Sequence, residues 1–307
     1  MARLEVVRGG ALTTVQDLGR WGWQGSGVPV AGPMDAYSHR LANRRAGNAD
    51  EAGALEVTIT GPVLRARGAV VCAVAGADFV LAVDGRGVDV SRAFAVGDSA
   101  ILRFGARRAG ARATLAVRGG LDVPEAFGSR ATSVTARLGP FGGRGLREGD
   151  ELEVGTAVET AAGAGRPLTL PAGGARLRVI VGPDEHRFSA AAVRTLCEAR
   201  FVVSAAADRM GYRLDGAALP APASDGMLSS PTPMGTLQVT PAGLPILLMA
   251  ERPTTGGYPR IATVISADLP LAGQLAPGDW IRFEACTPAA ARAALAAQEA
   301  ALRGEAC

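Results

Sequence analysis

The sequence predicts a mainly β protein with two β-rich halves and a few short helices. Short apolar runs rich in β-branched residues recur along its 307 residues, and clusters of Gly, Pro and Asp separate them. The clearest runs are Ala69–Val83, Ala113–Val117, Arg176–Val181, Pro245–Ala250, Ile261–Ser266 and Trp280–Phe283. Strands spaced in this way indicate barrels or sandwiches rather than alternating strand and helix units.

Three segments predict helices through the residues that can cap them. Asp35 precedes AYSHRLANRRAG, Ser189 precedes AAAVRTLCEA, and Thr287, followed by proline, precedes the Ala-rich tail. In that tail Leu295 and Leu302 stand seven residues apart. They predict one apolar stripe that packs on a protein surface.

The chain is long enough for two ordinary domains, and its 48% hydrophobic content supplies a core for each. We predict an N-terminal β-rich domain over residues 1–155, a C-terminal barrel domain over 175–286, and a C-terminal helix over 287–307. The stretch between Gly155 and Gly174 is rich in Gly and Pro and weakly periodic. It is interpreted as a linker.

Charge and composition exclude several classes of function. The net charge is +3 and the charges are dispersed, so the chain lacks the basic stripe that binds nucleic acid. All 32 basic residues are arginines, because the sequence contains no lysine. This absence excludes a Walker-type phosphate loop, a Schiff-base nucleophile and a biotin attachment site. Any biotin would have to be carried by another chain.

The same composition predicts the cellular setting. The four cysteines are widely spaced, and His39 and His186 lie on separate predicted helices, so no metal site is expected. His39 is interpreted as a helix-surface residue. The N-terminus lacks the apolar core of a signal peptide, and no apolar run approaches the roughly 20 residues of a membrane span. We expect a reduced, cytoplasmic protein with no membrane partner.

The first candidate binding segment runs from Gly9 to Asp35 and places polar side chains among glycines. These side chains are Thr13, Thr14, Gln16, Asp17, Arg20 and Asp35. Glycines let backbone N–H groups turn toward a ligand, and Arg20 can bind an anion through its fixed fork of donors. The alternative is a glycine-rich surface loop with a local pair between Asp17 and Arg20.

The second candidate is ADRMGYRLDG, from Ala207 to Gly216, which follows an apolar strand. Arg209, which follows Asp208, could present its guanidinium to the carboxylate of a ligand, and Gly211 permits a tight bend. The alternative is a solvated hairpin in which the Asp and Arg side chains pair in water.

The third candidate is TTGGYP, which lies between apolar strands. It comprises Thr254, Thr255, Gly256, Gly257 and Tyr258 before the proline. Paired hydroxyls and two unhindered amides suit an oxyanion, because preorganised N–H donors stabilise developing negative charge. A plain hairpin turn also needs Gly-Gly, and the neighbouring Arg252 and Arg260 bring the functional interpretation to parity with it.

Taken in order, these segments resemble the allophanate hydrolase subunit 2 family, also called the KipA-like carboxyltransferase family. The matching phrases are TTVQDLGR, GVPVAGPMDAYSHRLAN, LEVTITGPVL, LDVPEAFGSRAT, GPFGGRGLREGD, DRMGYRLDG, TTGGYPRIATVISADLP and LAPGDWIRF. They extend from about residue 3 to about residue 284, nearly the whole chain. The resemblance adds two candidate binding residues. Asn43 ends the phrase GVPVAGPMDAYSHRLAN, and Gln238 is a glutamine that this sequence keeps from the family pattern.

The resemblance implies two cyclophilin-like β-barrel domains and work in an assembly. Its partners would be a subunit 1 or KipI-like protein, which is the B subunit of 5-oxoprolinase, together with the A subunit of that enzyme. Such an assembly opens 5-oxo-L-proline to L-glutamate with ATP, which its members would share. The alternatives are the carboxyltransferase part of a biotin-dependent urea carboxylase or allophanate hydrolase-type system, with biotin in trans, and a KipA-like regulator that binds a KipI-like kinase inhibitor.

Opening a lactam requires donors for the developing oxyanion, a cation for the substrate carboxylate and amides for phosphate. The TTGGYP turn, Arg209 and the TTVQDLGR segment are the hypothesised sources of these three, in that order. The sequence departs from the family pattern at Ala207, where the family has Ser, and at Glu251-Arg252-Pro253, where it has Asp-Arg-Gln.

Overall fold

The computed structural model describes residues 2–157, 165–220 and 227–305, and the chain divides into two compact units. Unit 1 comprises Met1–Trp21, Ala31–Leu170 and Glu299–Cys307, and unit 2 comprises Gly22–Val30 and Pro171–Gln298. The chain passes from unit 1 to unit 2 at Leu170, inside the stretch interpreted as a linker. Residues 158–164 of that stretch lie outside the described residues. A further boundary between the units falls within the C-terminal helix, between Gln298 and Glu299.

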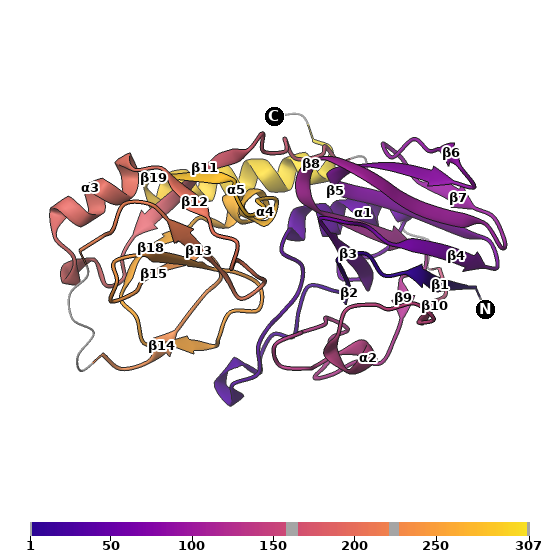
Figure 1. Cartoon of the computed structure of the whole chain (residues 1–307), viewed down its shortest axis with the longest axis horizontal. Helices are drawn as coiled ribbons and strands as arrows, with labels where there is room; N and C mark the ends of the chain where they lie inside the picture. Colours follow the sequence, from indigo (N-terminus) through magenta and orange to yellow (C-terminus); the bar gives the residue numbers. More distant parts are fainter. Residues whose placement is uncertain (1, 158–164, 221–226, 306–307) are drawn as a thin grey trace. The chain divides into compact units, whose positions relative to one another are not determined.

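Unit 1 is built around one curved sheet (Figure 1). Its strands are β1 (Arg3–Arg8), β2 (Leu12–Gln16), β3 (Ala54–Thr58), β4 (Val63–Arg67), β5 (Val70–Val83), β6 (Arg86–Gly87), β7 (Phe94–Val96), β8 (Ile101–Val117), β9 (Leu121–Asp122) and β10 (Glu151–Val154). The strand order is β2-β3-β8-β4-β1-β10-β9, and β5 pairs with β8, β6 and β7. The long β5 and β8 lie side by side and bend, because their register shifts between Gly76 and Leu81.

The predicted strands match the structure in unit 1 with one exception. The run Ala69–Val83 forms β5, but Ala113–Val117 is only the last part of the 17-residue β8. The first part of β8 carries several Arg and Gly residues, whose side chains are mostly exposed. Its strand conformation therefore comes from pairing with β5 and β4 rather than from an apolar alternation.

Two apolar clusters form the core of unit 1. The larger one gathers strand residues such as Leu4, Val57, Leu102 and Leu115, all almost fully buried. The smaller one lies under helix α1 (Ala36–Ala46), whose residues pack on β5 and β8. Asp35 accepts a hydrogen bond from Ser38 N at 2.8 Å, which confirms it as the cap of α1. The short α2 (Pro140–Gly143) follows a loop.

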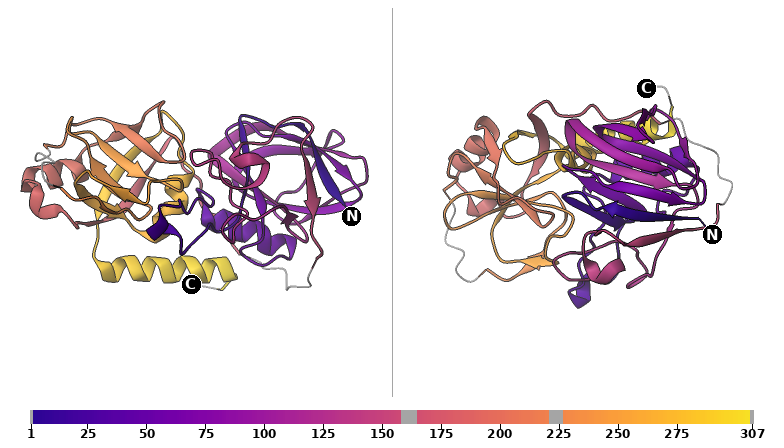
Figure 2. Two further views of the ribbon diagram at one scale, coloured as in Figure 1. Left: turned by 90° about the horizontal axis from the view of Figure 1, so that it is seen from below. Right: turned by 45° about the vertical axis from the view of Figure 1, so that its right-hand side comes forward.

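Unit 2 is a closed barrel, whose curving strands are seen in Figure 2. In ring order the strands are β11 (Gly174–Val181), β18 (Arg260–Val264), β15 (Thr236–Val239), β16 (Pro245–Leu248), β13 (Gly211–Asp215), β12 (Phe201–Val203) and β19 (Trp280–Ala285). The ring is closed by a parallel pairing of β11 with β19, and the other barrel pairings are antiparallel. A separate ribbon pairs β14 (Ser230–Pro231) with β17 (Thr255–Gly256).

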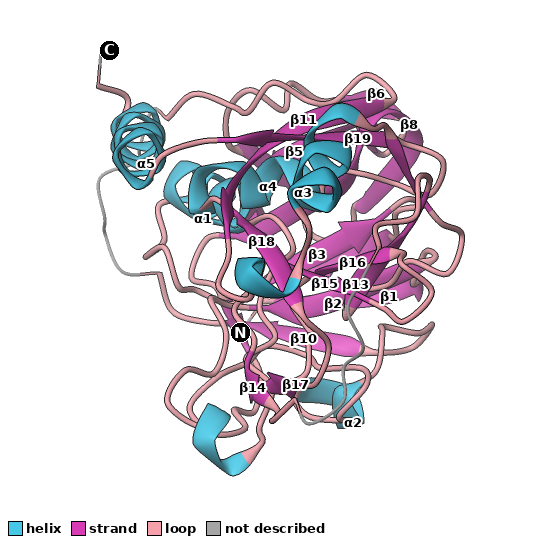
Figure 3. Cartoon of the chain, turned by 90° about the vertical axis from the view of Figure 1, so that its left-hand side faces the viewer, coloured by secondary structure: helices cyan, strands magenta, loops and turns pink. Residues whose placement is uncertain are grey.

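Several short helical segments belong to unit 2, and Figure 3 draws all helices of the chain in cyan. The short segments of unit 2 are η1 (Gln24–Ser26), η2 (Glu185–Arg187), α3 (Ala190–Glu198), η3 (Ser266–Asp268) and α4 (Leu269–Gly273). The side chain of Ser189 accepts from Ala192 N at 3.2 Å, so the predicted cap of α3 is confirmed. Helix α3 packs on β19.

The C-terminal helix α5 (Pro288–Arg303) begins after Thr287, whose hydroxyl accepts from Ala290 N at 3.2 Å. The predicted apolar stripe is only half correct. Leu302 is fully buried against Leu41 and its neighbours in unit 1, whereas Leu295 is 37% exposed. The helix therefore contributes one apolar anchor to unit 1, not two.

The prediction of a mainly β protein with two barrel-like sheets and a few short helices is confirmed. None of the helices in the described residues has the length and hydropathy that crossing a membrane requires. The ADRMGYRLDG and TTGGYP segments both belong to unit 2. The sheet of unit 1 contains the TTVQ part of the first candidate segment as β2.

Candidate functional site

The first candidate segment includes β2, and the polar side chains of that strand are buried. Thr13, Thr14 and Gln16 are each at most 1% exposed. The hydroxyl of Thr13 donates to Gly9 O at 2.7 Å, and Gln16 Nε2 donates to the Thr14 hydroxyl at 3.0 Å. These side chains are therefore part of the interior of unit 1 and make hydrogen bonds within it.

Asp17 ties the end of β2 to a loop more than a hundred residues away. Its Oδ1 accepts from Gly19 N at 2.9 Å and from the Ser129 hydroxyl at 2.6 Å, and its Oδ2 accepts from Arg130 N at 2.5 Å. The carboxylate organises the FGSRAT loop, which is one of the phrases that carried the family resemblance.

Arg20 and Gln16 bind the same loop through its carbonyl groups. The Arg20 guanidinium donates from Nε to Ala126 O at 3.2 Å and from Nη2 to Ala131 O, and the side chain is 1% exposed. Gln16 Nε2 donates to Thr132 O at 3.0 Å. The guanidinium of Arg20 and the amide of Gln16 therefore link the end of β2 and the residues after it to the 126–132 loop.

Asn43 is at the centre of a second buried polar group under α1. Its Nδ2 donates to Ala52 O at 2.9 Å and lies 3.1 Å from His39 Nε2, while its Oδ1 accepts from Asn48 Nδ2 at 3.0 Å. The interpretation of His39 as a helix-surface residue was wrong, because the ring is fully buried. Burial lowers the pKa of His39 to about 4, so the imidazole is neutral at pH 7.

A buried carboxylate that no sequence signal indicated, Glu56, lies beside the first segment. Glu56 pairs in register with Thr14 on one side and with Thr114 on the other, and its side chain is 2% exposed. Its Oε2 accepts from Met34 N at 2.6 Å, which holds the approach to α1. In the sequence, Glu56 stands at an ordinary alternating position of a strand, so only the pairing identifies it.

In unit 2, Asp208 forms the turn of the predicted hairpin. Its Oδ1 accepts from Met210 N at 2.8 Å and from Gly211 N at 3.1 Å, and the residue is exposed. The strands β12 and β13 pair antiparallel with Val202 opposite Asp215, so the hairpin itself is confirmed. Asp208 acts here on the backbone of the turn.

Arg209, the residue predicted to meet a carboxylate, already has one inside the unit. Its Nε donates to Glu251 Oε1 at 2.6 Å, and the two side chains are 6% and 1% exposed. The backbone strengthens this link, because Glu251 N donates to Arg209 O at 2.7 Å. The alternative of a solvated hairpin is therefore wrong for Arg209. Its hypothesised role as the cation for substrate would require it to share its guanidinium with Glu251.

The TTGGYP segment forms the edge of a ribbon, not a free turn. Ser230 stands opposite Gly256 and Pro231 opposite Thr255 in the pairing of β14 with β17. Thr254 O accepts from Thr232 N at 3.1 Å. Thr255, Gly257 and Tyr258 are exposed, and Thr254 and Gly256 are half-buried. Most residues of this segment are thus accessible, unlike the buried Thr13, Thr14, Gln16 and Arg20 of the first segment.

Gln238 lies directly behind this ribbon. It is 4% exposed, and its Nε2 donates to Tyr258 O at 3.3 Å. A Cβ placed on Gly256 would lie 2.3 Å from the same nitrogen. The glycine therefore leaves room for the Gln238 side-chain amide, which would have to shift if a larger residue stood at this position.

Arg252, which lies between Glu251 and the Thr pair, is a second buried guanidinium. Its Nε donates to Thr232 O at 2.7 Å, and its Nη1 lies 3.4 Å from Met249 O and 3.5 Å from Ala250 O. The side chain is 8% exposed, and burial lowers the pKa of the Arg252 guanidinium. In the sequence, Arg252 stands next to the Thr pair without a motif that predicts its own role.

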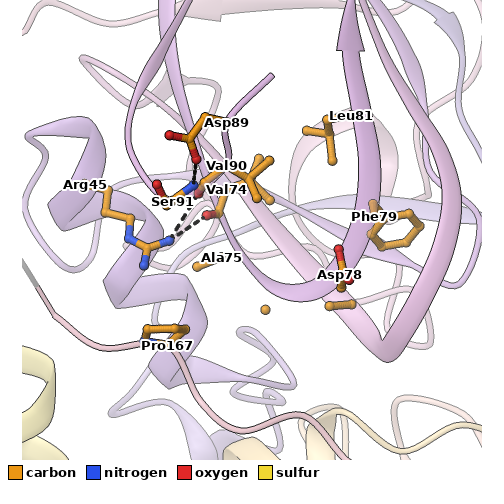
Figure 4. Close-up of a pocket in the computed structure, with 12 residues that line it drawn as sticks. Arg45, Val74, Ala75, Asp78, Phe79, Leu81, Asp89, Val90, Ser91 and Pro167 are labelled. Carbon is orange, nitrogen blue, oxygen red and sulfur yellow. Dashed lines mark hydrogen bonds between the residues drawn. The ribbon is translucent and has the colours of Figure 1, made fainter. Parts of the chain in front are cut away.

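Unit 1 also contains a cavity that none of the predicted residues lines (Figure 4). Its volume is about 380 Å³, and β5 residues such as Val74, Phe79 and Leu81 form an apolar wall. Arg45 enters it from the last turn of α1 and donates from Nη1 to Val74 O at 3.1 Å and Val90 O at 3.4 Å. The guanidinium thereby fastens the loop before β7 to the edge of β5.

The predicted site residues of unit 1 and those of unit 2 differ in their exposure to solvent. In unit 1 they are buried and hydrogen-bonded to their own unit, whereas in unit 2 the TTGGYP ribbon is largely accessible and follows the buried Glu251 and Arg252 in the sequence. Among residues 2–157, 165–220 and 227–305, no three His, Cys, Asp or Glu side chains are placed to hold a metal ion.

Residues 26–285 match the family model described as carboxyltransferase domain, subdomain A and B. Two bacterial relatives are named as the C subunit of 5-oxoprolinase. The one from Escherichia coli is 34% identical over 92% of this chain and 91% of its own length, and the one from Haemophilus influenzae is 33% identical over 89% and 87%. A urea amidolyase from Lachancea kluyveri is 32% identical over 97% of this chain but only 18% of its own length.

Solved structures agree with these relatives. The urea amidolyase of K. lactis is 31% identical, with a TM-score of 0.93 over 99% of this chain. The chain spans only 20% of that protein's length. The structure of TTHA0988 is 38% identical, with a TM-score of 0.83 over 92% of this chain and 55% of its own. The matched model, the near full-length relatives and the shared fold agree, so the chain belongs to the carboxyltransferase domain family of subdomains A and B.

Proposed function

We propose that this chain is the C subunit of an ATP-dependent 5-oxoprolinase, which opens 5-oxo-L-proline to L-glutamate together with partner subunits. The observation that supports this most is the similarity, over most of the length of both chains, to relatives named as the C subunit of 5-oxoprolinase. The match covers 92% of this chain and 91% of the Escherichia coli relative, so the two are similar in extent as well as in sequence. The absence of lysine agrees with a subunit that carries no biotin.

The chemistry of the reaction defines what this chain would contribute. A five-membered lactam is a stabilised amide, so its cleavage is favoured by activation of the carbonyl oxygen, for which phosphorylation by ATP is the simplest route. Negative charge then develops on oxygen, and preorganised donors lower the barrier without having to reorient. In this proposal the accessible Thr254, Thr255, Gly256 and Gly257 provide those donors.

ATP is a substrate of the whole assembly in this proposal. The side chains of Gln16, Asp17 and Arg20, which had been hypothesised to meet phosphate, make internal hydrogen bonds to the 126–132 loop. They would have to exchange these bonds to contact a nucleotide. We therefore assign them the positioning of that loop, and we assign phosphate binding to groups that the partner subunits share with this chain.

The proposal is tested by reconstitution. The chain is co-expressed with a subunit 1 protein and with the A subunit of the enzyme, and the purified assembly is supplied with ATP and 5-oxo-L-proline. ADP and glutamate are expected only when all three chains are present. Formation of both products without this chain would eliminate it as a required subunit.

A second function, carboxyl transfer in a biotin-dependent system, is favoured by the fungal relatives. The urea amidolyase and urea carboxylase structures each align with 98% or more of this chain at a TM-score of 0.93. In that case a biotin carrier and a biotin carboxylase would be the partners, with biotin supplied in trans. Transfer of label from bicarbonate to a urea-like product, in an assay that includes both partners, would favour this function over lactam cleavage.

A further inference from the structure

Unit 2 contains two buried arginines, Arg209 and Arg252, whose guanidinium groups have different kinds of partner. Arg209 has the Glu251 carboxylate at 2.6 Å. Arg252 is hydrogen-bonded to backbone carbonyl oxygens, those of Thr232, Met249 and Ala250. Within the described residues, no carboxylate forms a hydrogen bond or ion pair with Arg252. A buried charge without a counter-ion is costly, so this guanidinium is prepared to receive an anion from outside the unit.

The hydrogen-bond geometry leaves part of the Arg252 fork available. Nε and Nη1 face the carbonyl oxygens, and no hydrogen bond to Nη2 is present among the described residues. The carbonyl contacts fix the plane of the guanidinium, so an incoming oxyanion would meet a donor that has already lost its conformational freedom. Such preorganisation is what makes arginine effective for carboxylates and phosphates.

The location of Arg252 links it to the accessible ribbon. Thr232, whose carbonyl accepts from Arg252, donates its own N–H to Thr254 O at 3.1 Å and its hydroxyl to Pro253 O. Arg252 precedes Thr254 and Thr255 by two and three residues in the sequence. It is also linked to their segment through Thr232, the residue that follows β14. A ligand bound by the ribbon hydroxyls and amides would have this guanidinium as a neighbouring positive charge without a carboxylate partner.

We propose that Arg252, and not Arg209, is the arginine of unit 2 that binds the oxyanion of the ligand at the Thr254–Gly257 ribbon. The ligand group is a carboxylate or a phosphoryl group. The inference rests on the proposed function only for the identity of the natural ligand, which would be the carboxylate of 5-oxo-L-proline or a phosphate derived from ATP. Arg209 then acts as a structural partner of Glu251 that holds the segment before the ribbon.

The test measures anion binding by the full chain and does not depend on catalysis. The thermal midpoint of unfolding is recorded with increasing inorganic phosphate, and in a separate arm with 5-oxo-L-proline, at constant ionic strength. An anion that binds the folded state raises the midpoint as its concentration exceeds its dissociation constant. Wild type is expected to rise by a few degrees in at least one arm, and Arg252→Met is expected to lose that rise. Arg213→Met, which removes the same charge from an exposed position of β13, should keep it.

The result in the absence of anion separates binding from a purely structural role. If Arg252 only braces the ribbon, Arg252→Met would lower the midpoint without ligand and leave the anion-dependent rise intact. Arg252→Lys keeps the charge but loses the fork, so it should retain a weakened rise. The arm that responds identifies carboxylate or phosphate as the ligand group. No rise in wild type in either arm, or an equal rise in Arg252→Met, would overturn the inference, whether or not the chain belongs to a 5-oxoprolinase.

Discussion

The guanidinium Nε of Arg209 donates to Oε1 of Glu251 at 2.6 Å, with both side chains almost fully buried and 42 residues apart in the sequence. The pair joins the β12–β13 hairpin to the segment that leads into the TTGGYP ribbon. Removing one partner leaves a buried charge without compensation, whereas removing both does not. The two single substitutions and the double substitution should therefore behave very differently.

We expect Arg209→Met and Glu251→Gln each to lower the free energy of unfolding by about 3–5 kcal/mol, the loss typical of a broken buried pair. The double variant Arg209→Met/Glu251→Met should lose less than either single variant. Urea denaturation with a double-mutant cycle measures this coupling. Additive losses in the double variant would show that the pair is not coupled as the 2.6 Å contact indicates.

The ribbon should tolerate a methyl group at one glycine and not at its neighbour. A Cβ on Gly256 would lie 2.3 Å from Gln238 Nε2, whereas the nearest atom to a Cβ on Gly257 is Ser229 Oγ at 3.8 Å. We expect Gly256→Ala to cost about 1–3 kcal/mol through overpacking. Gly257→Ala should change stability by less than about 0.5 kcal/mol. Adding Gln238→Ala should recover part of the loss in Gly256→Ala, and a lack of recovery would place the strain elsewhere.

The buried imidazole of His39 should make stability depend on pH. Its pKa is about 4 in the folded protein, compared with 6.5 for an ordinary histidine. Between these values the unfolded chain binds more protons, so the free energy of unfolding falls as the pH drops from about 6.5 toward 4. A pKa difference of this size corresponds to a loss of about 3 kcal/mol over the window. Urea denaturation at pH 7 and at pH 5 should show a smaller pH dependence in His39→Gln, while the exposed His186→Gln should match wild type.

Asp17 should control the order of a loop far from it in sequence. Asp17→Asn replaces one acceptor oxygen by a donor, so it cannot accept from both Gly19 N and Arg130 N, which bind different oxygens of Asp17. We expect a loss of about 1–3 kcal/mol and faster hydrogen exchange at the amides of residues 129–132. Exchange in β1, which Asp17 does not contact, is the internal reference. Unchanged protection at residues 129–132 would contradict the role of Asp17 in holding the loop.

The candidate site shows which of its features follow from local sequence. The glycines and hydroxyls of TTGGYP predicted an accessible group of donors, and the structure leaves Thr255 and Gly257 exposed. The role hypothesised for Arg209 did not anticipate its partner, because nothing near Arg209 in the sequence indicates that Glu251 will face it. The contrast between Arg209 and Arg252 exists only after the barrel has formed.

The sequence by itself determined the strand-rich class, the helix starts at Asp35, Ser189 and Thr287, and the chemistry that a chain without lysine cannot perform. These features depend on residue type and on hydrogen bonds that reach three residues along the chain. Tertiary structure alone decided that β8 extends through Arg-rich residues, that His39 is buried, and that Asp17 and Arg20 bind the 126–132 loop. These outcomes depend on pairing and packing between segments tens to more than a hundred residues apart, whose burial removes water and so decides which polar groups must meet.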